Sequence, residues 1–456
     1  MIEEVQKENK MGYMPVPKLL FTMSMPMIIS MLVQALYNIV DSVFVAQVSE
    51  NALTAVSMAF PVQNLMIAVT AGTGVGINAL LSRSLGEKQT EQASLAARNG
   101  LFLGVLCYLA FALFGILGSR FFYTNQTTDP ELITYGTQYV FVVTVFSFGI
   151  CLAIVGERLL QSTGLTIYNM FSQTLGAVIN IVLDPILIFG LFGFPRLEVM
   201  GAAIATVVGQ ICGMMVSIIC NIKKNKEINI NMRGFRPDKD TIKKIYVVGL
   251  PSIIMQSIGS VMVFGMNKIL MMFSSTAVSV FGVYFKLQSF IFMPVFGLNN
   301  GMVPIIAYNF GARRKKRILQ TAWLSIASAT GIMLIGLVVF QTQTTWLLSI
   351  FDASPDMMEI GVRALRVISL SFLFAGYCIV VGSVFQALGN GVYSLMVSVA
   401  RQLLFILPAA YIFAKFWGLE MVWWAIPLAE LVSLTMSSIL FLRIYRKKIK
   451  NIEEDI

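Results

Sequence analysis

The sequence predicts an all-α membrane protein whose twelve transmembrane helices form two parallel six-helix lobes, related by a pseudo-twofold axis along the membrane normal. Three observations support this prediction. The 456 residues are 57% hydrophobic and only 12% charged, and their mean hydropathy is +0.78, which is typical of polytopic membrane proteins rather than soluble domains. The apolar residues form twelve spans long enough to cross a bilayer. The two halves of the chain also repeat one another at a fixed spacing.

The twelve spans follow one another with short polar connections. Their approximate limits are 17–45, 52–82, 94–118, 133–155, 163–190, 200–222, 243–272, 278–309, 318–342, 358–381, 390–414 and 420–443. Several exceed the roughly 20 residues that a bilayer requires, so we expect tilted or bent helices. The prolines within the spans are natural bend points: Pro26, Pro251, Pro294, Pro304, Pro408 and Pro427.

An internal repeat relates the two halves of the chain. Pro26 and Pro251 are 225 residues apart, and the same spacing relates many other identical residues without a gap. These further pairs include Gln63 and Gln288, Gly72 and Gly297, Gly76 and Gly301, Gly136 and Gly361, Gln161 and Gln386, and Gly164 and Gly389. Because each repeat has an even number of spans, both repeats enter the membrane in the same sense, and a substrate cavity is expected between them.

The repeat and the charge pattern define the predicted domains. They are an N-terminal segment (1–16), an N-lobe (17–222), a linker (223–241), a C-lobe (242–443) and a C-terminal tail (444–456). Lys and Arg gather in residues 223–244, 313–317 and 443–450, whereas the opposite loops are poor in basic residues. The positive-inside rule therefore places both termini and the linker in the cytoplasm. The net charge of +10 comes from these clusters, so it indicates topology rather than nucleic-acid binding.

Asp184 is the most unusual residue of the fifth span. It lies in a long apolar run, directly before Pro185, which cannot donate a backbone N–H. A charge at this depth costs several kcal/mol unless it is paired, protonated or facing water. Asn180 lies one helical turn earlier on the same face. The structural alternative is an Asp-Pro pair that only distorts the helix and bonds to the backbone.

The remaining composition narrows the chemistry. The chain has no histidine, so any proton chemistry within the membrane falls mainly to Asp and Glu. Its five cysteines all lie in or at the ends of apolar spans, a pattern that suggests neither disulfides nor a zinc site. We find no nucleophile or metal cluster typical of a membrane-embedded enzyme. The sequence thus predicts a non-enzymatic protein without a bound cofactor.

Several motifs resemble the multidrug and toxic compound extrusion (MATE) family, and the likeness covers nearly the whole chain. Asn-x-x-x-Asp-Pro at 180–185 and Gly-Ala-Ala-x-Ala-Thr at 201–206 are specific when they occur together. Further matches are Pro26 with Asn38 and Asp41, the glycine-rich stretch 72–86, and Leu-Gln-Ser-Thr-Gly at 160–164. The resemblance implies a bacterial inner-membrane exporter of mostly cationic, amphipathic compounds, driven by proton or sodium entry.

In relatives with acids in the first lobe, carboxylates of the first and fifth spans form the coupling site. That role carries over to Asp41 and Asp184, with Asn180, Tyr37 and Asn38 as plausible neighbours. Both acids lie roughly 30–35 Å along helices that start in the cytoplasm, so a shared site is possible. Two adjacent carboxylates hold at least one proton more tightly than either alone. They could equally coordinate sodium, and the sequence leaves this choice open. The structural alternative for Asp41 is an exposed residue near a helix end.

The second half offers candidates for the substrate cavity. Glu430 and Arg401 reach similar depths, so they form either a stabilising ion pair, which we favour slightly, or a site where Glu430 attracts a cationic drug. The repeat-related Gln63 and Gln288 are further candidates, together with Asn299 and Asn300. The glycines of 72–76 and 297–301 are better explained by close helix packing.

The sequence therefore predicts a monomeric antiporter that exports small cationic drugs or metabolites by alternating access. The main alternative is a flippase for a lipid-linked saccharide from the same broad superfamily, but a wide basic cleft would be expected for it and mid-span cations are few. A major facilitator would show a glycine, aspartate and arginine pattern that residues 82–97 lack. The internal repeat and the asymmetric acids argue for a carrier rather than a channel.

Overall fold

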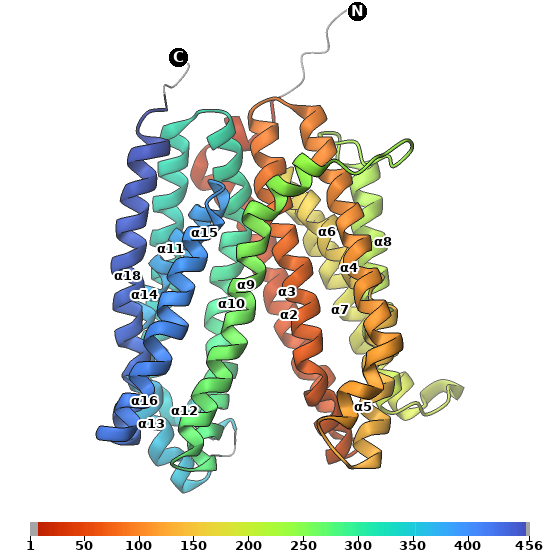
Figure 1. Ribbon diagram of the computed structural model, residues 1–456, viewed down its shortest axis with the longest axis vertical. Coiled ribbons are helices and arrows are strands. Elements are labelled where there is room, and N and C mark those ends of the chain that lie inside the picture. The colour runs from red at the N-terminus through yellow and green to blue at the C-terminus, as the bar shows by residue number, and fades with distance from the viewer. Residues whose placement is uncertain (1–7, 352, 453–456) are drawn as a thin grey trace, which may run out of the picture. The chain divides into compact units, whose positions relative to one another are not determined.

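The computed structural model describes residues 8–351 and 353–452, and every regular element in these residues is helical (Figure 1). Ten helices are long and apolar enough to cross a membrane, and two bent helix pairs raise the number to as many as 12. The predicted all-α membrane class is confirmed. Residues 1–7 of the predicted N-terminal segment and residues 453–456 of the predicted tail lie outside the described residues.

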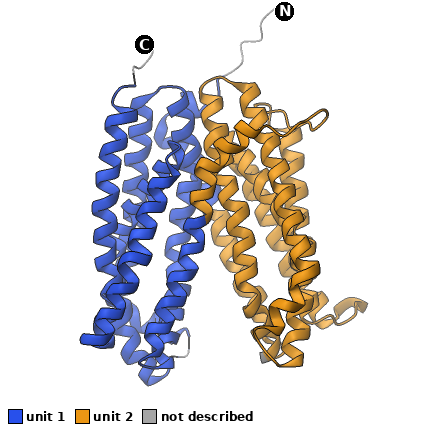
Figure 2. Cartoon of the chain, in the orientation of Figure 1, with its two compact units in different colours: residues 1–28, 254–456 blue, residues 29–253 orange. Residues whose placement is uncertain are grey.

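The chain forms two compact units (Figure 2). Unit 2 comprises residues 29–253 and unit 1 comprises the residues before and after them. Unit 2 contains the later part of α2 (Val16–Ala46), α3 (Glu50–Gly86), α4 (Thr90–Thr124), α5 (Pro130–Val145), α6 (Phe148–Ser162), α7 (Thr166–Phe189), η1 (Leu191–Gly193), α8 (Val199–Lys223) and the start of α9 (Lys239–Met271).

Unit 1 contains the second repeat and the beginning of the chain. Its elements are α1 (Lys10–Tyr13), the start of α2, the later part of α9, α10 (Ser275–Gly311), α11 (Lys315–Thr342), α12 (Thr344–Ser349), α13 (Pro355–Ser369), α14 (Phe372–Ala387), α15 (Gly391–Val399), the π-helical turn η2 (Ala400–Ile406), α16 (Leu407–Phe416), α17 (Leu419–Val422), α18 (Ala425–Ile444) and η3 (Tyr445–Ile449).

The first halves of α2 and α9 pack in the unit that holds the other repeat. In unit 2, a Cβ atom added to Gly76 of α3 would lie 2.1 Å from the carbonyl oxygen of Ile245 in α9. In unit 1, a Cβ atom added to Gly301 of α10 would lie 2.7 Å from the Cα atom of Ser24 in α2. Glycine is therefore required at both repeat-related positions for close helix packing, as the sequence indicated.

Local features recur at the 225-residue spacing. Ser49 and Ser274 cap the N-termini of α3 and α10, and each side chain accepts a hydrogen bond from the backbone N–H three residues later, at 3.0 and 3.1 Å. Gly164 and Gly389 follow α6 and α14 with φ values of +86° and +75°. This left-handed conformation favours glycine because other residues would place a Cβ atom against the backbone. The repeat therefore extends to caps and turns.

Two spans bend sharply where no proline lies. α5 and α6 meet at 44°, and α13 and α14 meet at 50°. The breaks contain Phe146 and Ser147 in the first pair and Leu370 and Ser371 in the second. Conversely, α7 continues through Pro185 to Phe189. Proline positions alone therefore do not predict where these spans bend.

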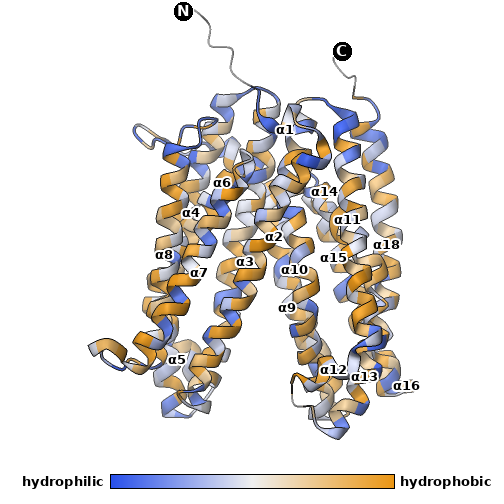
Figure 3. Cartoon of the chain, turned by 180° about the vertical axis from the view of Figure 1, so that it is seen from behind, coloured by the Kyte–Doolittle hydropathy of each residue, from blue (hydrophilic) through white to orange (hydrophobic). Residues whose placement is uncertain are grey.

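Hydrophobic residues dominate the length of the helices, and hydrophilic residues gather toward their ends (Figure 3). On α4, for example, Leu117 and Phe121 are 73% and 72% exposed, as expected for a surface solvated by lipid. In unit 1, Lys315 donates to the carbonyl oxygen of Lys450 at 3.0 Å, which joins the basic start of α11 to the C-terminal segment. In unit 2, the backbone N–H of Asn229 donates to Ser94 at 2.9 Å, so the basic 223–241 connection docks on α4.

Candidate functional site: an acid pair in unit 2

Asp41 of α2 and Asp184 of α7 meet inside unit 2. Their side chains lie close enough to interact directly with each other. Asp184 is 0% exposed, and the Oδ1 atom of Asp41 is buried without a hydrogen-bond partner. Two carboxylates this close repel one another unless a proton or a cation neutralises one of them.

The local sequence explains how α7 delivers Asp184 to this position. α7 carries buried polar residues at four-residue spacing, Ser172, Asn180 and Asp184, with Gly176 between them. This spacing keeps them on one face of the helix. Pro185 leaves a backbone carbonyl one turn earlier without its usual N–H donor, yet the helix continues to Phe189. The polar face of α7 packs against α8 rather than lipid, which makes the buried acid tolerable.

Asn180 links the acid pair to α8. With its amide nitrogen facing Asp184, it donates to the Oδ2 atom of Asp184 at 3.2 Å and its oxygen accepts from the Thr206 hydroxyl at 3.2 Å. The same oxygen accepts from the backbone N–H of Thr206 at 3.2 Å. Asn180 is 2% exposed, so these bonds are made away from bulk water. They fix the orientation of Asp184 relative to α8.

Two tyrosines complete the surroundings of the pair. Tyr37 of α2 and Tyr139 of α5 both lie near enough to Asp41 and Asp184 to interact with them electrostatically. Tyr139 is 2% exposed, and its hydroxyl accepts a hydrogen bond from Gln63 of α3 at 3.2 Å. Side chains from α2, α3, α5, α7 and α8 thus converge on one polar cluster within unit 2.

The structure brings together most of the predicted coupling residues. Asp41, Asp184, Asn180 and Tyr37 are neighbours, whereas Asn38 is exposed and no hydrogen bond from its side chain to either carboxylate is formed. Sequence reasoning missed Tyr139 and Thr206. Thr206 ends the Gly-Ala-Ala-x-Ala-Thr motif, so the motif itself contained the signal for it.

The cluster offers only oxygen atoms and amide groups to a ligand. Two carboxylates, one amide and the hydroxyls of tyrosine and threonine suit a proton or a hard cation such as sodium, which favours oxygen ligands. Among the described residues, no group of three or more His, Cys, Asp or Glu side chains is placed to hold a metal ion. The unpartnered Asp41 Oδ1 atom is the free acceptor of this site.

Glu430, predicted either to attract a drug or to form an ion pair, is paired with Arg401. The Oε2 atom of Glu430 lies 3.1 Å from the Nη1 atom of Arg401 in the π-helical turn η2. The Glu430 side chain is 3% exposed and the Arg401 side chain is 31% exposed. The guanidinium of Arg401, rather than the carboxylate of Glu430, is therefore the charged group of this pair that a ligand could reach.

The other predicted cavity residues are divided between the units. Gln63 bonds to Tyr139 in unit 2, whereas Gln288, Asn299 and Asn300 lie on α10 in unit 1. Asn299 is 5% exposed and its buried Oδ1 atom has no hydrogen-bond partner. Gln288 and Asn300 are partly buried.

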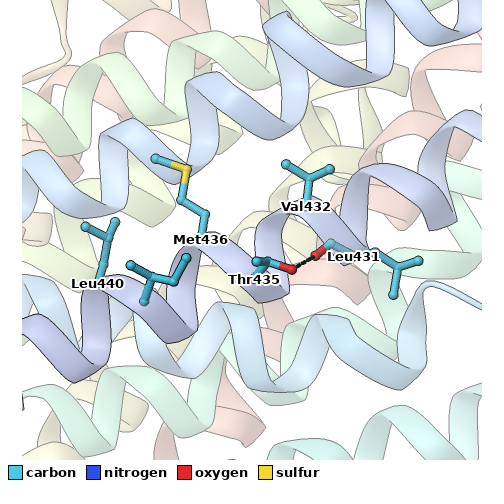
Figure 4. Close-up of a pocket in the computed structure, with 6 residues that line it drawn as sticks. Leu431, Val432, Thr435, Met436 and Leu440 are labelled. Atoms are coloured by element: carbon cyan, nitrogen blue, oxygen red, sulfur yellow. Dashed lines mark hydrogen bonds between the residues drawn. The ribbon is translucent and has the colours of Figure 1, made fainter.

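A hollow of about 440 Å³ lies along α18 in unit 1 and is almost entirely apolar (Figure 4). Its lining residues belong to α18, and its one hydroxyl, that of Thr435, donates to the carbonyl oxygen of Leu431 at 2.9 Å. The hydroxyl is thus already satisfied by its own helix. This surface is what a lipid-facing helix presents, and it adds no charged group to the site.

Comparisons with known proteins agree with this architecture. The chain is 26% identical to the multidrug export protein MepA of Staphylococcus haemolyticus over 416 residues, which cover 91% of each chain. It is 27% identical to an FAD transporter of Shewanella oneidensis over 425 residues, or 92% of each chain. These two names describe transport of different compounds.

Solved structures match almost the whole chain. The outward-facing conformation of a multidrug resistance MATE family transporter of the MOP superfamily matches with a TM-score of 0.91 at 25% identity, covering 97% of this chain and 99% of that one. A MOP superfamily transporter from Pyrococcus furiosus, described as having a binding pocket of reverse polarity, matches with a TM-score of 0.91 at 25% identity and covers 98% of this chain and all of that one.

The family profile of MatE matches the chain twice, at residues 26–186 and again at residues 251–412. The two matches reproduce the repeat seen in the sequence, and together they cover well over half of the chain. The chain belongs to the MatE family of multi-pass membrane transporters.

Proposed function

We propose that this protein exports small cationic amphipathic compounds across the bacterial cell membrane in exchange for protons or sodium entering at Asp41 and Asp184. The observation that carries the proposal is the contact between these two acids, one on α2 and one on α7, inside unit 2. The predicted topology, with the basic ends in the cytoplasm, belongs to the same proposal. So does action as a monomer without a resident cofactor.

Physical chemistry explains why such a pair couples transport to an ion. Two carboxylates in contact cannot both remain ionised in a site shielded from water without a large cost. A proton or a sodium ion removes that cost when it binds. The ion therefore favours conformations in which the site is closed, and the exported compound must favour others, since a ligand with equal affinity for both states shifts neither.

The relatives support drug export as the leading assignment. MepA is named a multidrug export protein, and the solved outward-facing relative is a multidrug resistance transporter. The flippase alternative gains no support from these names. A measurement that removes only the two carboxylate charges tests this assignment.

The decisive experiment is dye efflux from vesicles with a proton or a sodium gradient imposed separately. Asp41→Asn and Asp184→Asn keep the size of each side chain but remove its charge, so each is expected to reduce gradient-driven export at least tenfold. Asp356→Asn, at an exposed acid on α13, is the matched control and should export normally. Unchanged export in both site variants would overturn the coupling assignment.

A second candidate substrate class is anionic. The FAD transporter of Shewanella oneidensis is as similar to this chain as MepA is, and Arg401 is more exposed than the carboxylate with which it pairs. A flavin nucleotide carries phosphate groups that a guanidinium binds well. Flavin efflux that is lost in Arg401→Gln, together with absent dye efflux in the wild type, would favour this candidate over drug export.

A further inference from the structure

Unit 2 contains a third buried carboxylate that the proposed exchange does not use. Glu157 lies on α6, five residues before that helix ends, and is 8% exposed. Its closest polar contacts come from α7: the Gln173 amide donates to its Oε2 atom at 2.8 Å and the Ser172 hydroxyl lies 3.2 Å from its Oε1 atom. Burying a charged carboxylate within a membrane helix costs free energy, so the surroundings must show whether Glu157 is charged or protonated.

Glu157 is not neutralised by an ion pair. Among the described residues, no ion pair joins its carboxylate to a Lys or Arg, and Arg158, its neighbour on α6, interacts with it electrostatically. The Arg158 side chain instead runs along α3, 2.8 Å from where a Cβ atom on Gly74 would lie, and donates to Gln161 at 2.8 Å. The groups that face Glu157 from α7 do not titrate.

The distances around Ser172 suit a neutral carboxyl group. Ser172 has one hydroxyl hydrogen but two acceptors within reach, the Glu157 Oε1 atom at 3.2 Å and the carbonyl oxygen of Gly213 in α8 at 2.8 Å. If Glu157 is ionised, the single Ser172 hydrogen can be donated to only one of these two acceptors. If Glu157 carries a proton on Oε1, it donates to Ser172, and Ser172 donates to Gly213. Every group is then satisfied.

The donor set also selects the ligand. Gln173 directs an N–H at one carboxylate oxygen. A sodium ion would need several further oxygen ligands around this carboxylate, whereas a proton on the opposite oxygen needs only one acceptor, which the Ser172 hydroxyl supplies. Glu157 is therefore suited to bind a proton rather than a metal cation.

Glu157 is tied to the acid pair through the α7 and α8 helices. A Cβ atom on Gly209 of α8 would lie 2.5 Å from the Gly176 carbonyl oxygen of α7, so these helices pack as one tight pair. Asp184 and Ser172 are on the same helix, about 18 Å apart at the usual rise. α6 touches α8 where Asn221 donates to the Gly156 carbonyl oxygen at 2.8 Å, next to Glu157. Motion of α6 against the α7–α8 pair would therefore change the surroundings of Glu157.

We propose that Glu157 is a second proton-binding carboxyl group of the transport cycle, separate from the Asp41–Asp184 pair. It holds a proton in the arrangement described here. When α6 moves against α7 and α8 and water enters, the O–H bond breaks, the proton passes to water and the carboxylate remains until it is protonated again. The inference rests on the proposed function for its role in export, but the proton on Glu157 can be tested without transport.

The test is pH-difference infrared spectroscopy of the purified full-length protein in lipid nanodiscs. Wild type should show a protonated-carboxyl band at neutral pH that is lost as pH rises, and this band should be missing from Glu157→Gln. Gln173→Met removes a donor that stabilises the ionised form, so it should move the loss of the band to higher pH by about one unit. Glutamine nearly matches glutamate in shape, and Gln173→Met gives a second readout if Glu157→Gln folds poorly.

The outcomes separate this inference from the proposed function. If Glu157→Gln retains every band of the wild type and Gln173→Met shifts none, Glu157 holds no exchangeable proton and the inference is overturned. If the Glu157 band is found, proton-driven export by Glu157→Gln should fall at least tenfold while dye binding stays unchanged. Normal export in this variant would exclude a role in the cycle. Normal export in the Asp41 and Asp184 variants would instead reject only the proposed coupling pair.

Discussion

At the scale of single residues, Asn180 is the group that holds the acid pair in register with α8. Its amide bonds to Asp184 and to Thr206, both at 3.2 Å, and neither bond can be replaced by bulk water. We predict that Asn180→Ala weakens apparent affinity for the coupling ion roughly ten- to hundredfold, since a buried hydrogen bond to a charged group contributes about 1.5–3 kcal/mol.

The measurement is the ion concentration that gives half-maximal dye export. Asn38→Ala supplies the matched control, because Asn38 lies on the neighbouring helix α2 but is exposed. Its half-maximal concentration should equal that of the wild type. Equal losses in both variants would mean that the Asn180 bonds have no special part in ion binding.

Charge made part of this site predictable. Asp41 and Asp184 stand out in the sequence because a carboxylate in an apolar span is costly, and Asn180 follows from helical spacing. Tyr139 and Thr206 could not be found in this way, since tyrosine and threonine are ordinary in membrane helices. Glu157 was hidden for another reason: beside Arg158, it has the sequence pattern of two solvated charges near a helix end.

Asp238 lies outside the membrane-spanning segments and gives a prediction about pH. The side-chain and backbone hydrogen bonds from Thr241 lower the pKa of Asp238 below its usual value. Its stabilising effect is therefore present above the ordinary pKa of aspartate and is lost as pH falls through the lowered pKa. We expect Asp238→Ala to melt at a lower temperature than wild type at pH 7, and this difference should close in acid. A difference that persists at the lowest pH would contradict this account.

At the scale of helices, packing of backbone against backbone sets the α7–α8 contact. A Cβ atom on Gly209 would lie 2.5 Å from the Gly176 carbonyl oxygen, and that oxygen cannot rotate away. We predict that Gly209→Ala lowers the free energy of unfolding by about 1–3 kcal/mol, as overpacking usually does. Thermal unfolding in detergent measures this change.

Gly331 of α11 provides the opposite case. Beyond its own stretch of helix, no atom of the described residues lies within 4 Å of where its Cβ atom would be, and the residue is exposed. Gly331→Ala should therefore be neutral or stabilising by up to about 1 kcal/mol, because alanine loses less backbone entropy in a helix. If both variants lost equal stability, close α7–α8 packing would not be the cause.

Helix existence was predictable from the sequence, but helix shape was not. The twelve apolar spans correspond to ten long helices and two bent pairs. The bends lie at Ser147 and Ser371, which occupy nearly equivalent positions of the two repeats, whereas α7 passes through Pro185. A bend depends on what packs against the helix on each side, and hydropathy contains no information about that contact.

At the scale of the whole molecule, the sequence repeat and the compact units group the residues differently. The predicted lobes follow the repeat and meet at the 223–241 linker, whereas the compact units divide inside α2, after residue 28, and inside α9, after residue 253. The difference arises because the first half of α9 packs closely on Gly76, and the first half of α2 packs closely on Gly301. Such long-range pairing cannot be read from the spacing of apolar residues.

The packing of the first halves of α2 and α9 in the unit of the other repeat has a consequence for assembly. Each repeat buries its glycine surface against the leading helix of the other repeat, so neither repeat is complete without the other. Fragments 1–232 and 233–456, cut in the linker, should be degraded when expressed alone but should reconstitute export when produced together in one cell.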